Sequence, residues 1–356
     1  MKTKMQKCTA AMMAAVMMLS AGSIQTSAAQ DVQNIVILGD SLSAGTSLTT
    51  AEKSYVELVE DCALVNVQNF SAQGRTTQDV LDLMDSAQTK SALADADVIV
   101  VNVGIHDIMD PFMAKAHEYM DKWGFKKFSD VFFANLADYN LNEMDLMIYN
   151  AELVNAAETN KETAAANMTA IGEKLRSYKD ARVVIQNVYN PIDTIENLAD
   201  LSDKRQTVYN SICDVVSKAL NTSVNQSITE TAAANGYEVL DVFADFKGYA
   251  YQYVNLSDLD MNATAAGQRL VADKLIAKLG LIPRGDVNAD NAIDATDAAN
   301  ALIHSASIGA GGAGTISGKA LTAADVNEDN TVDSVDAARI LVYAAALGAD
   351  GDPSWE

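Results

Sequence analysis

Residues 35–42 read IVILGDSL, an uninterrupted apolar run that ends in glycine, aspartate and serine. Consecutive aliphatic residues without polar alternation are typical of a strand that is buried on both faces of a sheet. A serine directly after such a strand is presented at the edge of the sheet, where its hydroxyl can be reached. Ser41 is therefore a candidate nucleophile, although the same position also suits an ordinary helix cap.

Four further apolar segments of this kind follow, separated by stretches with helical spacing. The expected strands are 35–38, 65–70, 97–104, 182–188 and 237–242, and the expected helices are 51–61, 76–86, 150–179, 203–235 and 264–279. Short buried strands that alternate with helices indicate a parallel sheet covered on both faces. We predict a flavodoxin-like, three-layer α/β fold whose functional residues gather at the carboxyl ends of the strands.

Two more polar tips follow strands of this predicted sheet. The second strand leads into NFSAQGRTT (69–77), in which Gly74 could bring a backbone N–H close to a bound oxyanion. The third ends in Gly104-Ile105-His106-Asp107. His106 is a candidate functional residue at the same edge, and the alternative interpretation is a packed residue at a strand end.

Three polar tips in this order resemble the GDSL/SGNH hydrolases, which are serine esterases and lipases of this fold. Many members deacetylate plant polysaccharides. The resemblance covers about 34–280 and implies that Ser41 is the nucleophile, with the N–H groups of Ser41 and Gly74 donating to the oxyanion. The third block of the family usually reads Gly-x-Asn-Asp, and His106 stands where that asparagine donates to the oxyanion.

The fourth block of the family, Asp-x-x-His, holds the general base, and this chain lacks a histidine there. Counting back from Gly267 places Asn262 at the position of the histidine and Leu259 at that of the aspartate. A shift of one residue places Met261 and Asp258 there instead. The usual catalytic His and, in the first register, its Asp are missing.

Three explanations stay open, because a serine hydroxyl needs a base to become a nucleophile near neutral pH. In the first, the domain is degenerate and binds a ligand without turning it over. In the second, His106 and Asn262 have exchanged roles, so that His106 is the base and Asn262 a neutral hydrogen-bond donor. In the third, the base is Asp258, Asp260 or His117. We predict an esterase-like module for polysaccharide esters, with an inactive binding module as the alternative.

Residues 108–149 form an aromatic-rich insertion after the third strand. Its aromatic side chains are Phe112, Tyr119, Trp123, Phe125, Phe128, Phe132, Phe133, Tyr139 and Tyr149. Most of them are expected to pack helices onto the core as a satellite cluster. The functional alternative is a lid over Ser41, with Trp123 or a tyrosine stacking on a sugar or acyl group.

The end of the chain contains one pattern twice: DVNADNAIDATDAANALIHSA (286–306) and DVNEDNTVDSVDAARILVYAA (325–345). Oxygen-bearing side chains recur at loop positions 1, 3, 5, 9 and 12, the spacing of a calcium-binding loop, with a backbone carbonyl at position 7. The expected ligands are Asp286, Asn288, Asp290, Ala292, Asp294 and Asp297 in the first loop, and Asp325, Asn327, Asp329, Thr331, Asp333 and Asp336 in the second. At position 6, Asn291 and Asn330 can adopt the left-handed conformation.

This pair of repeats resembles the dockerin family, whose two calcium loop–helix repeats bind a cohesin on a scaffolding protein. The resemblance covers about 283–350 and implies two structural Ca²⁺ ions and a cohesin partner. The insert GAGGAGTISG (309–318) separates the repeats further than is usual in that family. His304 aligns with Tyr343 and is expected at a surface or an interface. The loop positions that usually carry specificity differ between the repeats, which favours a single binding mode.

The sequence predicts four segments in order. Residues 1–29 have the basic start, apolar stretch and small-residue site of a secretory signal, so we expect an extracellular, cellulosome- or surface-associated protein. The hydrolase-like domain is expected at 30–282, the dockerin at 283–350 and a short tail at 351–356.

The formal net charge of −23 argues against nucleic acid or an anionic membrane as a partner. Beyond the signal, no segment is apolar enough to span a membrane. Cys62 and Cys213 are the cysteines that follow the signal, and the sequence leaves open whether they pair.

Overall fold

The computed structural model describes residues 33–128, 130–195, 198–255 and 260–349, together with Gly351, Pro353 and Trp355. The predicted signal at 1–29 lies outside the described residues. Two compact units follow it: Val32–Leu281, which we call the hydrolase unit, and Ile282–Glu356, which we call the small unit. No helix among the described residues is long and apolar enough to cross a membrane.

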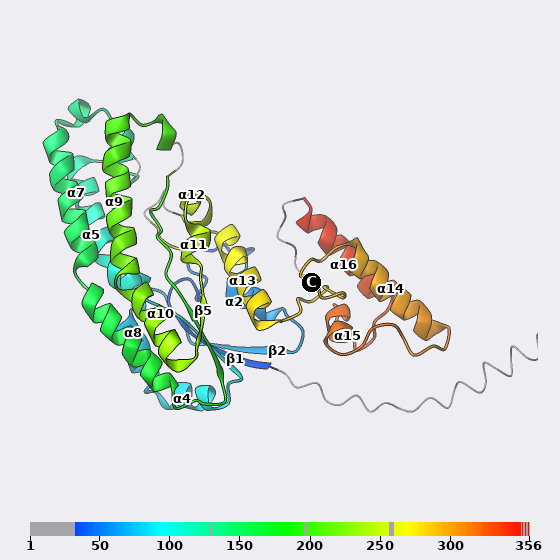
Figure 1. The fold of residues 1–356 in the computed structure, drawn as a ribbon. Helices are drawn as coiled ribbons and strands as arrows, with labels where there is room; N and C mark the ends of the chain where they lie inside the picture. Colours follow the sequence, from blue (N-terminus) through cyan, green and yellow to red (C-terminus); the bar gives the residue numbers. More distant parts are fainter. Residues whose placement is uncertain are drawn as a thin grey trace, which may run out of the picture. The chain divides into compact units, whose positions relative to one another are not determined.

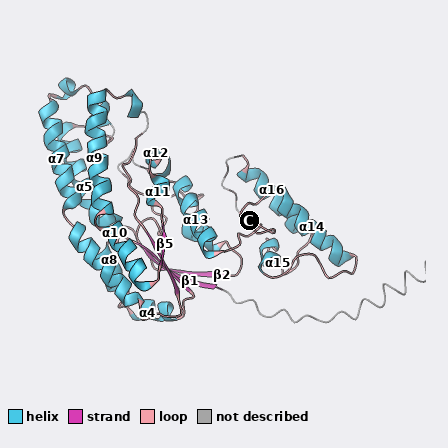
Figure 2. Cartoon of the chain, in the orientation of Figure 1, coloured by secondary structure: helices cyan, strands magenta, loops and turns pink. Residues whose placement is uncertain are grey.

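A five-stranded, all-parallel sheet forms the centre of the hydrolase unit (Figure 2). Its strands are β1 (Gln33–Gly39), β2 (Val65–Asn69), β3 (Val98–Asn102), β4 (Arg182–Gln186) and β5 (Glu238–Leu240). The strand order is β2-β1-β3-β4-β5, the flavodoxin-like order in which sites form where the order reverses, between β1 and β3. The predicted fold class is confirmed.

Helices cover both faces of this sheet (Figure 1). They are α2 (Tyr55–Glu60), α3 (Thr77–Leu83), α4 (Ala87–Ala94), α5 (Ile105–Trp123), α6 (Asp130–Phe133), η1 (Leu136–Tyr139), α7 (Glu143–Glu158), α8 (Lys161–Leu175), η2 (Leu198–Asp200), α9 (Asp203–Asn221), α10 (Val224–Asn235), α11 (Phe243–Phe246), α12 (Ala250–Tyr253) and α13 (Ala265–Leu279). Helices α2 and α13 pack together on one face, and α3, α8 and α10 pack together on the other. Buried aliphatic side chains of β1 and β3 fill the space between the layers.

Two expected helices are each divided in the structure. The expected helix 150–179 spans the break between α7 and α8, and 203–235 spans the break between α9 and α10. At the second break, the hydroxyls of Thr222 and Ser223 bond to backbone carbonyls one turn earlier, at Lys218 and Ala219. Small polar side chains compete in this way with the helical hydrogen-bond ladder.

The expected third strand was too long at its carboxyl end. It was expected to reach residue 104, but β3 ends at Asn102 and α5 begins at Ile105. Gly104 lies between them with φ 123°, a conformation that favours glycine and that lets the chain turn directly from strand to helix. This turn sets the start of α5, and with it the position of His106.

The aromatic-rich insertion mostly forms packing between helices. Helix α7 packs against both α5 and α9, and Figure 1 shows the three side by side. Tyr119, Trp123 and Tyr149 join α5 to α7, with ring centroids 4.9–5.2 Å apart. Phe133 and Tyr139 are exposed. The expected satellite cluster is present, and among the described residues no hydrogen bond or ring contact links these aromatics to Ser41.

Both cysteines of the hydrolase unit are buried thiols and form no disulfide within the described residues. The Cys213 Sγ donates to the carbonyl of Ile192 at 2.8 Å, and burial raises the pKa of this thiol. Both cysteines therefore behave as small core residues.

In the small unit, α14 (Ala295–Gly309) packs against α16 (Ser334–Leu347), with the short α15 (Lys319–Ala324) between them in sequence. Trp355 stacks on Tyr343 with centroids 3.9 Å apart and the rings nearly parallel. The Trp355 ring also occupies the space that a side chain at Gly285 would need. These contacts tie the end of the chain to the start of the first loop and complete the small core.

The surface position expected for His304 is wrong. Its side chain is only 6% exposed, and its Nδ1 accepts hydrogen bonds from the backbone N–H groups of Thr315 and Ile316. Gly314 packs so close to the imidazole that a Cβ there would clash. The glycine-rich insert thus folds back onto His304, which the alignment with Tyr343 did not reveal.

Candidate active site

Ser41, the candidate nucleophile, lies in a turn that hydrogen bonds between buried polar side chains hold in place. Ser41 follows β1 by two residues and is only 2% exposed, so the accessible hydroxyl expected from the sequence is wrong. Two residues later, the Ser43 hydroxyl donates to Asn102 Oδ1 at 2.9 Å and lies 2.6 Å from the Tyr55 hydroxyl. These bonds fix the turn between β3 and α2, so that Ser41 Oγ points toward the start of α5.

His106 is the second residue of α5, and its Nε2 lies 2.8 Å from Ser41 Oγ. Its other nitrogen, Nδ1, lies 2.8 Å from Oδ1 of Asp110, one helical turn further along α5. A carboxylate only accepts hydrogen bonds, so an ionised Asp110 requires the proton to be on Nδ1. In the neutral imidazole, Nε2 then carries the lone pair that faces the serine.

Three carboxyl groups act on the pKa of His106. Burial lowers this pKa, but the hydrogen bond to Asp110 and the charges of Asp40, Asp110 and Asp107 outweigh burial and raise it above its usual value. Burial in turn raises the pKa of Asp40 to about 7, against the opposing charge of His106.

Gly74 contacts the nucleophile from the next loop along the sheet edge. Its backbone N–H donates to Ser41 Oγ at 2.9 Å, and its φ of 75° lies in the left-handed region that favours glycine. Among the described residues, the Ser41 N–H forms no hydrogen bond. The N–H groups of Ser41 and Gly74 are therefore two backbone donors from which an oxyanion formed next to Ser41 could accept hydrogen bonds.

The structure does not bring Asn262 to this group of residues. Its Nδ2 donates to Ser47 Oγ at 3.1 Å and to the Asp260 carboxylate, and no described hydrogen bond joins it to Ser41 or His106. Asp260 is occupied by Asn262 in the same turn. His117 is exposed near the middle of α5, whereas Asp258 and Leu259 lie outside the described residues.

Asp110 was not among the residues singled out from the sequence. The signal was its spacing, because residues i and i+4 share one face of a helix, and His106 and Asp110 stand in that relation. The expected strand to residue 104 and an insertion from 108 hid this relation. Pro111 follows directly and has no N–H to donate the helical hydrogen bond to the carbonyl of Asp107, yet α5 continues through it.

The two acidic loops of the small unit have the backbone of the predicted calcium loops. Asn291 and Asn330, at position 6, have φ of 65° and 67°. Asp297 is fully buried and accepts hydrogen bonds from the N–H groups of Val287, Asn288 and Asp294, which closes the first loop. Asp336 closes the second loop in the same way.

The chemistry of these donors suits a hard cation. Burial raises the pKa of Asp286, Asp297 and Asp336, so each carboxylate lacks the solvation that a bound cation would replace. Within the described residues, no three His, Cys, Asp or Glu side chains form a ready-made metal cluster. The predicted ligand sets also contain Asn288 and Asn327 and two backbone carbonyls, which fits calcium.

The GDSL-like lipase/acylhydrolase family matches residues 37–270, about two thirds of the chain. The chain belongs to this family. A dockerin type I domain matches residues 284–343, so the hydrolase unit is followed by a dockerin. Dockerin domains bind cohesins and are generally calcium-binding, and the presence of one implies an extracellular, cellulosome-type assembly.

Solved structures of a lipase, a phospholipase and an esterase are similar to this chain. The lipase Lip_vut3 from a goat rumen metagenome is 20% identical, with 69% of this chain and 96% of that chain covered and a TM-score of 0.44. Phospholipase A1 from Streptomyces albidoflavus NA297 is 18% identical, with 69% and 99% covered and a TM-score of 0.43. The acetyl xylan esterase AlAXEase is 15% identical, with 69% and 99% covered and a TM-score of 0.36. Among curated proteins, no match was found.

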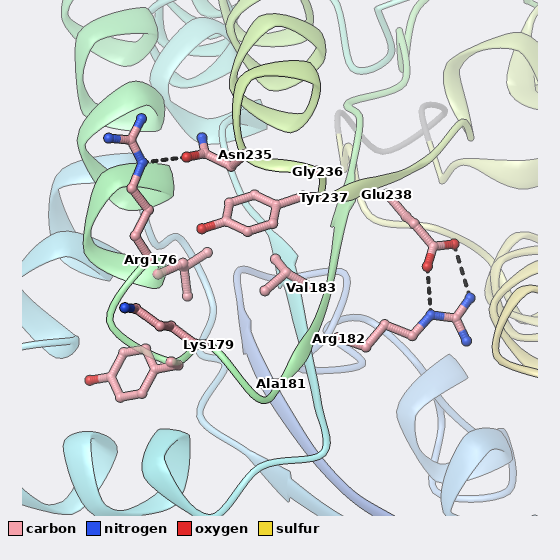
Figure 3. A pocket seen from close by; sticks show the side chains of 11 residues that line it. Arg176, Lys179, Ala181, Arg182, Val183, Asn235, Gly236, Tyr237 and Glu238 are labelled. Atoms are coloured by element: carbon pink, nitrogen blue, oxygen red, sulfur yellow. Dashed lines mark hydrogen bonds and ion pairs between the residues drawn. The ribbon is translucent and has the colours of Figure 1, made fainter.

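A cavity of about 320 Å³ lies at the opposite edge of the sheet, by the amino ends of β4 and β5 (Figure 3). Arg182 there is bound by both oxygens of Glu238, and Arg176 donates to Asn235. Arg176 and Lys179 follow the carboxyl end of α8, where cations ordinarily stabilise the helix dipole. The charges of this cavity are explained by the fold, and it is remote from the GDSL serine.

Proposed function

We propose that the hydrolase unit is a serine ester hydrolase in which the general base has moved from the fourth family block to the third. Ser41 is the nucleophile, His106 the base and Asp110 the carboxylate that orients it. One observation carries this proposal: the continuous chain from Ser41 Oγ through both nitrogens of His106 to Asp110, with 2.8 Å at each step. It favours the second explanation above over a degenerate site.

The reaction follows from the positions of these groups. Ser41 Oγ attacks the ester carbonyl carbon while its proton moves to His106 Nε2, and Asp110 stabilises the resulting imidazolium. The carbonyl oxygen becomes an oxyanion that accepts hydrogen bonds from the N–H groups of Ser41 and Gly74. His106 then gives its proton to the departing alkoxide, which leaves an acyl-serine. Water, deprotonated by His106, then attacks the acyl carbon, the bond from that carbon to Ser41 Oγ breaks, and His106 returns its proton to Ser41 Oγ as the acid leaves.

The exchange has a chemical cost. The usual third-block asparagine would add a side-chain donor to the oxyanion hole, and His106 cannot be both that donor and the base. Loss of one such donor typically lowers kcat by about 10²–10³-fold. We therefore infer a slower enzyme than family members that keep both groups, with the alcohol leaving on the α5 side, where Nε2 can protonate it.

The dockerin supports a proposal for where the protein acts and on which class of substrate. We propose that the small unit holds two structural Ca²⁺ ions, one in each acidic loop, and binds a cohesin of a scaffolding protein. Exposed apolar side chains on α14 and α16, including Ile303 and Val342 at equivalent repeat positions, are available for such a partner. A secreted enzyme on a cellulosome meets plant polysaccharides, so acetyl or similar esters on these polymers are the proposed substrates.

Replacement of Ser41 by alanine tests this function. The wild-type protein is expected to hydrolyse a p-nitrophenyl ester and to release acetate from acetylated xylan, and Ser41→Ala is expected to lose at least about 10²-fold in kcat/KM. A fluorophosphonate should react with Ser41 of the wild type, and mass spectrometry should locate the label on that residue. Equal rates for the two proteins would contradict the proposal and leave the inactive binding module.

Asp110→Asn is expected to change both the rate and its pH dependence. Asp110 raises the pKa of His106. The base must be neutral, so activity falls as the pH drops through that raised pKa. Removal of the charge lowers the pKa, and the acid limb of kcat/KM should therefore move to lower pH. The plateau should fall by roughly 10-fold, less than for a buried triad aspartate, because the Asp110 side chain is 50% exposed.

A pH–rate profile for an activated ester measures both effects. Asp121→Asn is the matched control, because it removes an exposed carboxylate near the other end of the same helix. If the acid limb of Asp110→Asn coincides with that of the control, Asp110 does not act on the base.

A further inference from the structure

Asp107 is a buried carboxylate next to the base, and the reaction above gives it no role. Its side chain does not reach Ser41 but turns to α3. Its Oδ2 accepts the backbone N–H of Thr77 at 2.8 Å, and its Oδ1 accepts the Thr77 hydroxyl at 2.7 Å. Both residues are buried, and Asn167 of α8 donates to the same hydroxyl at 3.1 Å.

Thr77 connects this carboxylate to the oxyanion loop. It is the first residue of α3 and follows Gly74 by three residues. Its N–H is one of the donors at a helix start that have no partner within the helix, and a carboxylate there is favoured by both the hydrogen bond and the helix dipole. Asp107 therefore joins the first turn of α5 to the first turn of α3.

The bond closes a ring around the nucleophile. Ser41 Oγ lies 2.8 Å from His106 Nε2 and accepts the N–H of Gly74 at 2.9 Å. Covalent chain connects Gly74 to Thr77 and His106 to Asp107, and the two bonds from Thr77 to Asp107 complete the circuit. A shift of α5 against α3 would change both contacts of Ser41 at once.

We propose that Asp107 is a positioning residue that holds the base and the oxyanion donor in register around Ser41. This inference rests on the proposed function, because the register matters for catalysis only if Ser41 attacks an ester. A misplacement of about 1 Å can cost about 10²-fold in rate, so two short bonds at this junction have a measurable effect.

The chain contains a matched control for this proposal. Asp79 accepts the N–H and the hydroxyl of Thr76 at 2.8 and 2.7 Å, almost the same geometry at the same end of α3. Asp79 belongs to α3 itself, however, and has no bond to α5. A role in stabilising the start of α3 would be shared by Asp79 and Asp107, whereas a role in joining α3 to α5 belongs to Asp107 alone.

The test compares Asp107→Asn, Thr77→Val and Asp79→Asn in the full-length protein. Asp107→Asn and Thr77→Val are expected to lower kcat on an activated ester by about 10–100-fold, with KM within about 2-fold, and Asp79→Asn should stay within about 2-fold of wild type. Thr77→Val keeps the carboxyl group of Asp107 but removes the hydroxyl bond that lowers its pKa, so its acid limb should move less than that of Asp107→Asn. Asp107→Asn removes one of the carboxylates, with Asp40 and Asp110, that face His106, so its acid limb should move to lower pH.

A second measurement does not depend on turnover. The proton between His106 Nδ1 and Asp110 is expected to give a low-field NMR signal, whose position and exchange rate would report how the imidazole is held. This signal should change in Asp107→Asn and Thr77→Val and stay unchanged in Asp79→Asn. Equal kcat values and equal signals in Asp107→Asn and Asp79→Asn, with both proteins folded, would overturn the positioning role. A wild type no faster than Ser41→Ala would overturn the proposed function instead, and the signal would still decide whether Asp107 positions His106.

Discussion

His106→Gln is expected to lower kcat/KM for an activated ester by about 10²–10⁴-fold, the usual contribution of a positioned base. Glutamine keeps a polar side chain of similar length but cannot take the serine proton. The effect follows from the 2.8 Å contact between Nε2 and Ser41 Oγ. His117→Gln is the control, because His117 is an exposed histidine of the same helix. Steady-state rates and circular dichroism of both variants provide the comparison.

His106→Asn sharpens this prediction because it changes the expected direction under the competing explanation. It restores the family's third block, Gly-x-Asn-Asp, and with it the asparagine that normally donates to the oxyanion. If Asp258 or Asp260 were the base, the restored donor should raise activity. With His106 as the base, the variant should be as inactive as His106→Gln. An activity of His106→Asn at or above that of the wild type would contradict the mechanism in which His106 is the base.

The fold could be predicted from local patterns because each of them is set by local chemistry. The apolar runs from Ile35 and Val98 are typical of buried strands, and their alternation with helices permits few topologies. The boundaries depended on single residues. The turn at Gly104 shortened the third strand, and the polar pair Thr222 and Ser223 divided a long apolar pattern into two helices.

The site was predictable where the sequence places residues at strand ends, and Ser41, Gly74 and His106 do lie together. What the sequence did not reveal was the direction of His106. The sequence places His106 near a strand end, but it is a helical residue, and α5 directs the imidazole toward Ser41. Once α5 is known to begin at Ile105, Asp110 follows from the helical period alone.

The second explanation assigned new roles to both His106 and Asn262. The structure places only His106 at Ser41. His106 contacts the nucleophile, whereas Asn262 bonds within its own turn and to Ser47. Asn262 was assigned the role of a hydrogen-bond donor only because it aligns with the histidine of the family's fourth block. No physical requirement supported that role. His304 shows the same limit of reasoning from aligned positions. Its alignment with Tyr343 did not reveal that it is buried and accepts hydrogen bonds from the backbone of the insert.

Calcium removal is expected to unfold the small unit and abolish cohesin binding while the hydrolase unit keeps its activity. The small core is mostly alanine and valine, and several of the carboxylates predicted as ligands are buried with raised pKa values. Each ion present at about 1,000 times its Kd stabilises the folded unit by about 4 kcal/mol. Loss of one such ion should lower the Tm of a unit of this size by roughly 15 °C or more.

The two units make this experiment its own control. With excess EDTA, calorimetry should show the small-unit transition shifted or lost, and titration calorimetry should show no cohesin binding. Ester hydrolysis should remain within about 2-fold, because Ser41, His106 and Asp110 contain no predicted metal ligand. Asp297→Asn and Asp336→Asn remove the closing carboxylate of one loop each, so each should reproduce part of the effect with calcium present. Binding and a small-unit transition that survive EDTA unchanged would refute the calcium assignment, since four aspartates in each loop repel one another without a cation.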